Sequence, residues 1–280
     1  MIPLPFQYHR ASDLTEALDL MAGNVSPSGQ DTVALAGGQS LVPMLRSRRL
    51  NPSVVVDIAG VGELDGITRD CGVLEIGALC NYGRLGAERE VIETVPMLAS
   101  VVSAIGDPAL RWSATLGGGL ALGDPRSDLA TVMLVVGADI GLASHKRPQV
   151  RWVPAQDFYL AGFKTAASPD ELIVGATIPE STTGWSYKRF ARRSHDWPVV
   201  SAAAVAAGGS CRVALCGMGS VPLRAWAVEE AMANGASPQE AAKLASEGTN
   251  PSSDHLATAD FRRHIAEILV RRAISEAVYT

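Results

Sequence analysis

The sequence has few cysteines, and their spacing does not match that of metal ligands. Cys71 and Cys80 are nine residues apart, and Cys211 and Cys216 are five apart. Neither pair forms a C-x-x-C unit, and no histidine stands at zinc-finger spacing beside them. This spacing argues against a structural metal or an iron–sulfur cluster in the chain and favours reduced, mostly buried thiols.

An excess of basic residues and long hydrophobic runs are also missing. Lys and Arg number 24 and Asp and Glu 29, so the formal net charge is −5, which argues against nucleic-acid binding. The apolar stretch 129–142 is too short to span a bilayer, and residues 1–30 show no secretory signal pattern. With 47% hydrophobic residues, the sequence predicts a soluble, cytoplasmic protein with a substantial core.

Residues for hydrolytic or metal-dependent catalysis are absent as well. No G-x-S-x-G motif occurs, and the five histidines are scattered singly along the chain. The sequence therefore predicts neither a metal site nor a set of catalytic side chains. The histidines are His9, His145, His195, His255 and His264.

Hydrophobic periodicity predicts three regions with different patterns of elements. The first alternates strand and helix, the second mixes both, and the third has three strands followed by three helices, which is an α+β pattern. Strands are expected at 32–36, 54–58, 74–78, 138–143, 150–153, 171–178, 185–191, 199–206 and 212–218. Helices are expected at 14–21, 41–50, 97–105, 129–136, 225–233, 238–245 and 261–277.

Glycine is the abundant residue, with 27 copies, and two glycine-rich segments stand out. The first, Ala36-Gly37-Gly38-Gln39-Ser40, lies between an expected strand and an expected helix. Glycines there permit positive φ and close approach of a ligand, and the following N–H groups form a donor set for an anion. An ordinary tight turn between strand and helix is an equally weighted alternative.

The second segment is Thr115-Leu116-Gly117-Gly118-Gly119. Three consecutive glycines are costly in chain entropy and suggest a close backbone approach. Neither segment matches the Rossmann or the P-loop pattern. Two such turns about eighty residues apart suit a dinucleotide that lies between two subdomains.

Taken in order, several motifs resemble the FAD-binding medium subunit of the molybdenum hydroxylases, the family of xanthine dehydrogenase and aerobic carbon monoxide dehydrogenase. The resemblance spans nearly the whole chain. Its motifs are the two glycine segments (36–41 and 115–119), DPRSDL at 124–129, DELI at 170–173, YKRFARRSHD at 187–196, VPLRA at 221–225, and the Arg-rich stretches 261–263 and 271–273.

This resemblance implies an α+β fold with two FAD-binding subdomains of the vanillyl-alcohol-oxidase (PCMH) type. A C-terminal domain of three antiparallel strands and a helical bundle follows. The expected boundaries are 1–60 for the first subdomain, 61–178 for the second and 179–280 for the C-terminal domain.

Motif matching assigns cofactor contacts residue by residue. Backbone donors of both glycine segments would hold the diphosphate, Asp128 would lie near the adenosine end, Ile173 would pack against the ring system, and Lys188 would lie at the polar flavin edge. The residues assigned to FAD are Ala36, Gly37, Gly38, Gln39, Ser40, Leu41, Thr115, Gly117, Gly118, Gly119, Asp128, Ile173, Lys188, Asp196 and Trp197.

Several assignments have alternatives. Asp128 alternatively caps the helix that follows it, and Lys188 alone is a typical solvated charge. Trp197 either faces the flavin or belongs to the core, and His195 is either structural or close to the flavin. Gly119 stands where the family often has Asn or Ser, so a side-chain contact is lost there.

By resemblance, the chain is an oxidoreductase subunit whose only redox group is FAD. A molybdopterin cofactor in a large subunit and two [2Fe–2S] clusters in a small subunit are expected as partners, in a dimer of heterotrimers (a heterohexamer). Electrons would pass from the clusters to FAD and then to an external acceptor. The alternatives are a stand-alone FAD-dependent oxidoreductase of the same fold and a nucleotide-binding scaffold subunit without redox activity. The substrate and the acceptor stay open.

Overall fold

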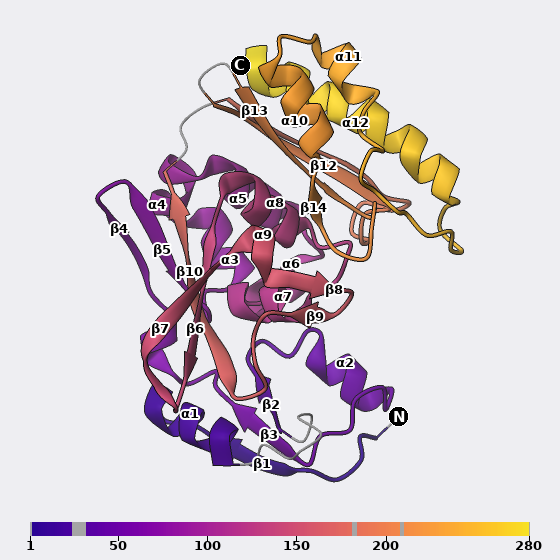
Figure 1. Ribbon diagram of the computed structural model, residues 1–280. Helices are drawn as coiled ribbons and strands as arrows, with labels where there is room; N and C mark the ends of the chain where they lie inside the picture. The colour runs from indigo at the N-terminus through magenta and orange to yellow at the C-terminus, as the bar shows by residue number, and fades with distance from the viewer. Residues whose placement is uncertain (1, 24–31, 181–183, 208–209, 280) are drawn as a thin grey trace.

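The computed structural model describes residues 2–23, 32–180, 184–207 and 210–279. Three sheets of three or more strands follow one another from the N-terminal end of the molecule to the C-terminal end (Figure 1). Each sheet uses strands from one continuous part of the chain, and helices fill the spaces between them. The division of the chain at residues 60 and 178 stays a prediction.

The first sheet is parallel, with the strand order β1-β3-β2. Three consecutive valines at 54–56 form its buried central strand, because β-branched residues fit a pleated surface that is covered on both faces. Met21 and Ala17 of the first helix pack into the same core as Val54 and Val56. The elements are β1 (Gln7–Arg10), α1 (Leu14–Gly23), β2 (Thr32–Leu35), α2 (Leu41–Arg46) and β3 (Val54–Asp57).

The second sheet is antiparallel, with the order β4-β5-β10-β6-β7, and the helices gather along one side of it (Figure 1). Its strands are β4 (Ile67–Asp70), β5 (Val73–Gly77), β6 (Asp139–Ser144), β7 (Arg147–Pro154) and β10 (Glu171–Pro179). The helices are η1 (Gly62–Leu64), α3 (Tyr82–Ala87), α4 (Arg89–Thr94), α5 (Pro96–Ala104), α6 (Pro108–Ser113), α7 (Leu116–Leu122), α8 (Asp128–Val136) and α9 (Ala155–Phe158). A short hairpin, β8 (Tyr159–Ala161) and β9 (Lys164–Thr165), completes this part.

Every residue of α8 is buried, because this helix lies between the second and third sheets. Its sequence is apolar all round, as expected of a helix with no solvent face. One side of the third sheet packs on α8 through Ala203, Val205 and Ala214. These small residues let the helix approach the sheet closely.

The third sheet is antiparallel, with the order β11-β12-β13-β14. Its outer face packs against the C-terminal helices through residues that alternate with those facing α8, such as Ala202 and Ala204. The expected meander of three strands is confirmed, and a short fourth strand adds to it. The helices cover the sheet as a layer, where a bundle was expected (Figure 1). The elements are β11 (Trp185–Phe190), β12 (Val200–Ala207), β13 (Ser210–Cys216), β14 (Leu223–Arg224), α10 (Trp226–Ala233), α11 (Pro238–Ala242) and α12 (Ala259–Tyr279).

Two sequence-based expectations on elements need correction. The glycine-rich segment at 115–119 is not a turn, because Leu116–Leu122 forms helix α7 with Thr115 as its N-cap. The short helices α3, α4 and α6 were not expected, since six residues carry too little periodicity to be recognised. Within the described residues, no helix is both long and apolar enough to cross a membrane.

All four cysteines are free, and three of them are buried. Burial raises the pKa of Cys80 and Cys216 to about 12 and that of Cys211 to about 11. Cys71 is exposed in the β4–β5 turn. The expectation of mostly buried, unpaired thiols is therefore confirmed.

We predict that a disulfide reagent at pH 8 modifies one thiol quickly in the native protein. The thiolate is the reactive form, and burial both suppresses it and blocks the reagent at the other three positions. Absorbance of the released thiol should report about one equivalent in the native state and about four after unfolding. In Cys71→Ser the fast phase should vanish; a fast phase that persists would show that a buried thiol is accessible.

Candidate functional site

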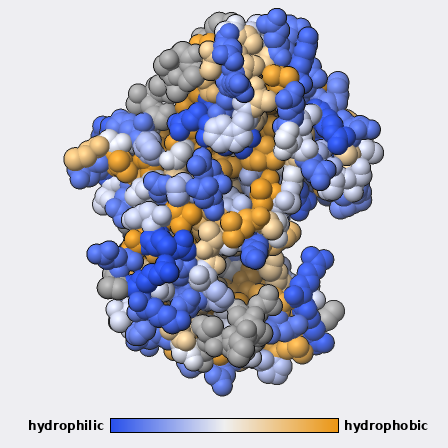
Figure 2. Space-filling view, in the orientation of Figure 1, coloured by the Kyte–Doolittle hydropathy of each residue, from blue (hydrophilic) through white to orange (hydrophobic). Residues whose placement is uncertain are grey.

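A cavity of about 610 Å³ lies where the three sheet regions meet. Its wall comes from the β2–α2 turn, α7, the start of α8, β10 and the loop between β11 and β12. Figure 2 shows hydrophobic surface in the waist between the N-terminal part, at the bottom, and the rest of the molecule. A volume of this size is typical of a cofactor site.

The β2–α2 turn presents free backbone donors to this cavity. Within the described residues, the N–H groups of the five residues from Gly37 to Leu41 have no hydrogen-bond acceptor in the protein. All five residues line the cavity. Gly38 has φ +70°, which a side chain would strain and which turns successive N–H groups towards one side. Consecutive N–H groups of this kind form a binding site for an anion such as a diphosphate.

Gly37 is required by the protein's own packing. An ideal Cβ at this position would lie 1.7 Å from the carbonyl oxygen of Ser113. The turn therefore crosses directly over the segment that leads into α7. The reason for glycine at Gly37 is contact between two backbone segments, whereas the sequence suggested close approach of a ligand.

The second glycine segment, at 115–119, forms part of the cavity wall, but most of its backbone N–H groups already have acceptors within the protein. At the start of α7, the N–H of Leu116 donates to Cys80 O at 2.9 Å and the N–H of Gly117 donates to Ala78 O at 2.8 Å. The N–H of Gly118 donates to Oγ1 of Thr115 at 3.2 Å. These N–H groups are engaged within the protein, so the expectation that they bind the diphosphate finds no support. Thr115, Gly117, Gly118 and Gly119 nevertheless line the cavity.

At Gly119, neighbouring side chains leave no room for a Cβ. An ideal Cβ there would lie 2.1 Å from the hydroxyl of Tyr82 and 2.9 Å from Cδ2 of Leu129. The hydroxyl of the buried Tyr82 fills the space that a larger residue at position 119 would need. Tyr82 on α3 thus occupies the space where the family often has an Asn or Ser side chain at this position.

Asp128 lines the cavity and is buried at the first residue of α8. Ser127 is the N-cap, and its side chain accepts from Ala130 N at 3.1 Å, so the capping alternative for Asp128 is wrong. Oδ1 of Asp128 accepts a hydrogen bond from the hydroxyl of Tyr187, and Oδ2 lies 3.5 Å from Nη2 of Arg189. Burial raises the pKa of Asp128, while Arg189 and Tyr187 oppose that rise.

Lys188 does not line the cavity. It forms an ion pair with Glu276 of α12, on the outer side of the third sheet. Because successive residues of a strand face opposite sides, its neighbour Arg189 lies in the cavity wall. The expectation that Lys188 places its charge at the cofactor therefore finds no support in the structure. The alternation of side chains along the expected strand 185–191 already indicated that residues 188 and 189 face opposite sides of the sheet.

Three further predicted residues line the cavity. Ile173 on β10 is buried, and Asp196 and Trp197 come from the β11–β12 loop. Trp197 is 45% exposed, with the guanidinium of Arg126 at 5.8 Å from the ring centroid, so it is not a core tryptophan. His195 also lines the cavity.

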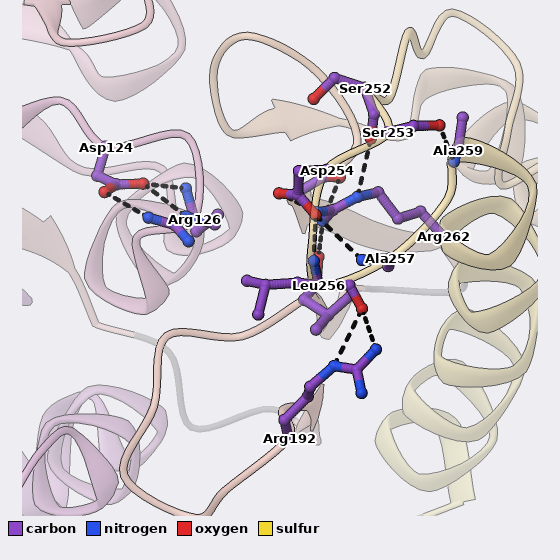
Figure 3. A network of polar contacts seen from close by, with 12 residues as sticks. Asp124, Arg126, Arg192, Ser252, Ser253, Asp254, Leu256, Ala257, Ala259 and Arg262 are labelled. Carbon is purple, nitrogen blue, oxygen red and sulfur yellow. Dashed lines mark hydrogen bonds and ion pairs between the residues drawn. The ribbon is translucent and has the colours of Figure 1, made fainter.

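Two arginines hold the base of the β11–β12 loop (Figure 3). Arg192 donates from Nε to Leu256 O at 3.0 Å. Arg262 is 2% exposed; it donates to Val199 O, and its Nη2 lies 2.8 Å from Oδ2 of Asp254. The loop that carries Trp197 is therefore anchored to the segment before α12. In the sequence, Arg262 stands out only as part of an Arg-rich motif.

Two family models of flavoprotein domains match the chain. The family model described as "FAD binding domain in molybdopterin dehydrogenase" matches residues 4–181, and the model "CO dehydrogenase flavoprotein C-terminal domain" matches residues 185–277. The chain belongs to this family. The expected resemblance to FAD-binding medium subunits of molybdenum hydroxylases is confirmed.

Two characterised relatives cover almost the whole chain. It is 31% identical to the carbon monoxide dehydrogenase medium chain of Afipia carboxidovorans, over 99% of this chain and 98% of the relative. It is 33% identical to the glyceraldehyde dehydrogenase medium chain of Sulfolobus acidocaldarius, over 99% of each. Among solved structures, carbon monoxide dehydrogenase from Hydrogenophaga pseudoflava matches with a TM-score of 0.93 and 32% identity, over 100% of this chain and 99% of that one.

The residues of the cavity fit FAD, the cofactor of this family. Free N–H groups at 37–41 suit its diphosphate. An apolar part of the wall, with Ile58, Leu79 and Ile173, suits a flat ring. The cavity thus offers separate surfaces to the charged and the aromatic parts of a dinucleotide.

We predict that Gly37→Ala lowers the free energy of unfolding by about 3 kcal/mol or more, because its Cβ overlaps the backbone of Ser113. Urea denaturation measures this change. Gly62→Ala is the matched control, since a Cβ at Gly62 meets nothing within 4 Å, and it should change stability by less than about 1 kcal/mol. Equal stability of the two variants would contradict the close crossing.

We predict that wild type loses stability relative to Asp128→Asn as pH rises from 4 to 8. A carboxyl whose pKa is raised by burial binds its proton more tightly in the folded state, so stability falls as pH rises above the unfolded value of about 3.9. Each unit of pKa difference contributes about 1.4 kcal/mol. Tyr187→Phe removes a hydrogen bond to the carboxylate and should steepen this loss. A difference that does not change with pH would contradict the argument.

Proposed function

We propose that the chain is the FAD-binding electron-transfer subunit of a three-subunit molybdenum hydroxylase. In this proposal FAD receives electrons from two [2Fe–2S] clusters in a small subunit and passes them to an external acceptor. A large subunit carries the molybdenum cofactor and the substrate. Two such trimers form a heterohexamer in the cytoplasm, where unpaired thiols like the four in this chain persist.

The observation that carries the proposal is the cavity with five consecutive N–H groups that have no acceptor among the described residues, in a chain that matches medium subunits over 99% of its length. Solved relatives include a Cu,Mo-containing carbon monoxide dehydrogenase, which is 30% identical to this chain. The relatives oxidise substrates as different as carbon monoxide and glyceraldehyde, according to their names. The substrate is therefore a property of the large subunit, and the medium subunit serves a common electron route.

The residues of this chain bind and shield the cofactor. The N–H groups at 37–41 would hold the diphosphate, and Ile173 with its apolar neighbours would hold a ring. Trp197, with Arg126 beside it, would cover part of the opening and limit access by water. When bound, FAD supplies the redox chemistry, accepting and releasing electrons.

We predict that a tagged chain purified from its natural host is yellow and carries two partner subunits. Mass spectrometry and metal analysis should give FAD, iron and molybdenum in a ratio of about one to four to one, since two [2Fe–2S] clusters contain four irons. Light scattering should give the mass of a dimer of heterotrimers.

Other results would each remove part of the proposal. A chain that holds FAD and oxidises a substrate without any iron-containing partner would be a stand-alone flavin oxidoreductase. A colourless chain that binds no FAD on reconstitution, yet joins partners, would be a scaffold subunit.

A further inference from the structure

Arg189 is the only Lys or Arg among the described residues that line the cavity. It lies on β11, and its side chain is 19% exposed. Three carboxylates share the wall with it, namely Asp128, Glu171 and Asp196. His195 is the other basic side chain there. A cofactor with a negatively charged diphosphate thus meets one permanent positive charge from a side chain in this cavity.

The guanidinium of Arg189 is held in place by the loop that follows its strand. Nη1 donates to Ser194 O at 3.0 Å, and Nη2 donates to Asp196 O. Nη2 also lies 3.5 Å from Oδ2 of Asp128. Two carbonyls and one carboxylate therefore fix the direction of the side chain, and a planar fork suits this arrangement better than an ammonium group does.

The protein does not fully satisfy or neutralise this guanidinium. Its Nε is buried with no hydrogen-bond partner among the described residues. Its carboxylate partner, Asp128, is buried, and burial disfavours the negative charge of that partner. Glu171 is engaged elsewhere, since both its oxygens accept from Arg151. Positive charge therefore remains at Arg189 for a ligand.

Lys188, the adjacent residue, provides the contrast. Its ammonium group pairs with Glu276 on α12, on the other side of the sheet. Both residues are cations on the same strand, but only Arg189 belongs to the cavity wall. This difference makes Lys188 a matched control for the effect of charge in the cavity.

We propose that Arg189 supplies the positive charge that bound FAD meets, and that this charge both strengthens FAD binding and favours reduced FAD over oxidised FAD. The inference rests on FAD binding by this cavity and is independent of the partner subunits. Positive charge near the flavin stabilises the form that carries additional electrons. The preceding arrangement, with carbonyl acceptors on one side and a weakly charged carboxyl on the other, leaves the charge effective towards the cofactor.

The test uses the full-length chain as wild type and as Arg189→Gln, Arg189→Lys and Lys188→Gln. FAD fluorescence titration gives the dissociation constant, and equilibration with a reference dye gives the midpoint potential of bound FAD. Circular dichroism and thermal unfolding check that each variant folds.

We expect Arg189→Gln to weaken FAD binding about tenfold or more, as for loss of a charged hydrogen-bonding group. Its midpoint potential should fall, and a tenfold loss of preference for reduced FAD corresponds to about 30 mV for a two-electron couple. Arg189→Lys keeps the charge and should restore most of the midpoint potential. Lys188→Gln should match wild type within about twofold in affinity.

A merely structural role for Arg189 predicts a different result. In that case Arg189→Gln and Arg189→Lys would weaken FAD binding equally, with an unchanged midpoint potential, and the proposal would be overturned. A larger shift in Lys188→Gln than in Arg189→Gln would overturn it as well. If wild type itself bound no FAD, the cofactor assignment would fail first; partner association is read separately by co-purification.

Discussion

The close crossing of two backbone segments at Gly37 is the constraint on which the site depends. The β2–α2 turn passes over Ser113 with no room for a Cβ. The crossed segment is tied down on its other side, because Tyr82 N donates to Ala114 O and Gly117 N donates to Ala78 O. Two regions nearly eighty residues apart are thereby fixed against each other, and the cavity is the space that this contact leaves open.

The two glycine segments differ in whether their backbone N–H groups are available to a ligand. Hydrogen bonds to residues 78–80 occupy the first N–H groups of α7, whereas the N–H groups at 37–41 keep no acceptor among the described residues. An unpaired backbone donor is unfavourable unless water or a ligand satisfies it. One segment therefore builds the cavity wall, and the other offers the donors to an anion.

The third sheet closes the cavity from the opposite side. Small residues on β12 let the sheet lie close to α8, which places β11 next to Asp128 at the start of that helix. Residues 195–197 of the β11–β12 loop line the cavity, and Arg262 holds the base of this loop at Val199 O. A charge and a partly exposed aromatic side chain in the cavity wall thus come from one anchored strand and loop.

The sequence alone determined the family, the cofactor, the α+β class and the order of most long elements, because motifs and periodicity are local properties. Of the fifteen residues assigned to FAD from the sequence, fourteen line the cavity and Lys188 does not. The contacts of these residues with FAD stay a prediction. Only the tertiary structure decided that Lys188 faces α12 while Arg189 faces the cavity, since the face of a strand is set by what packs on it. It likewise decided which backbone donors stay free, because their competitors lie far away in the sequence.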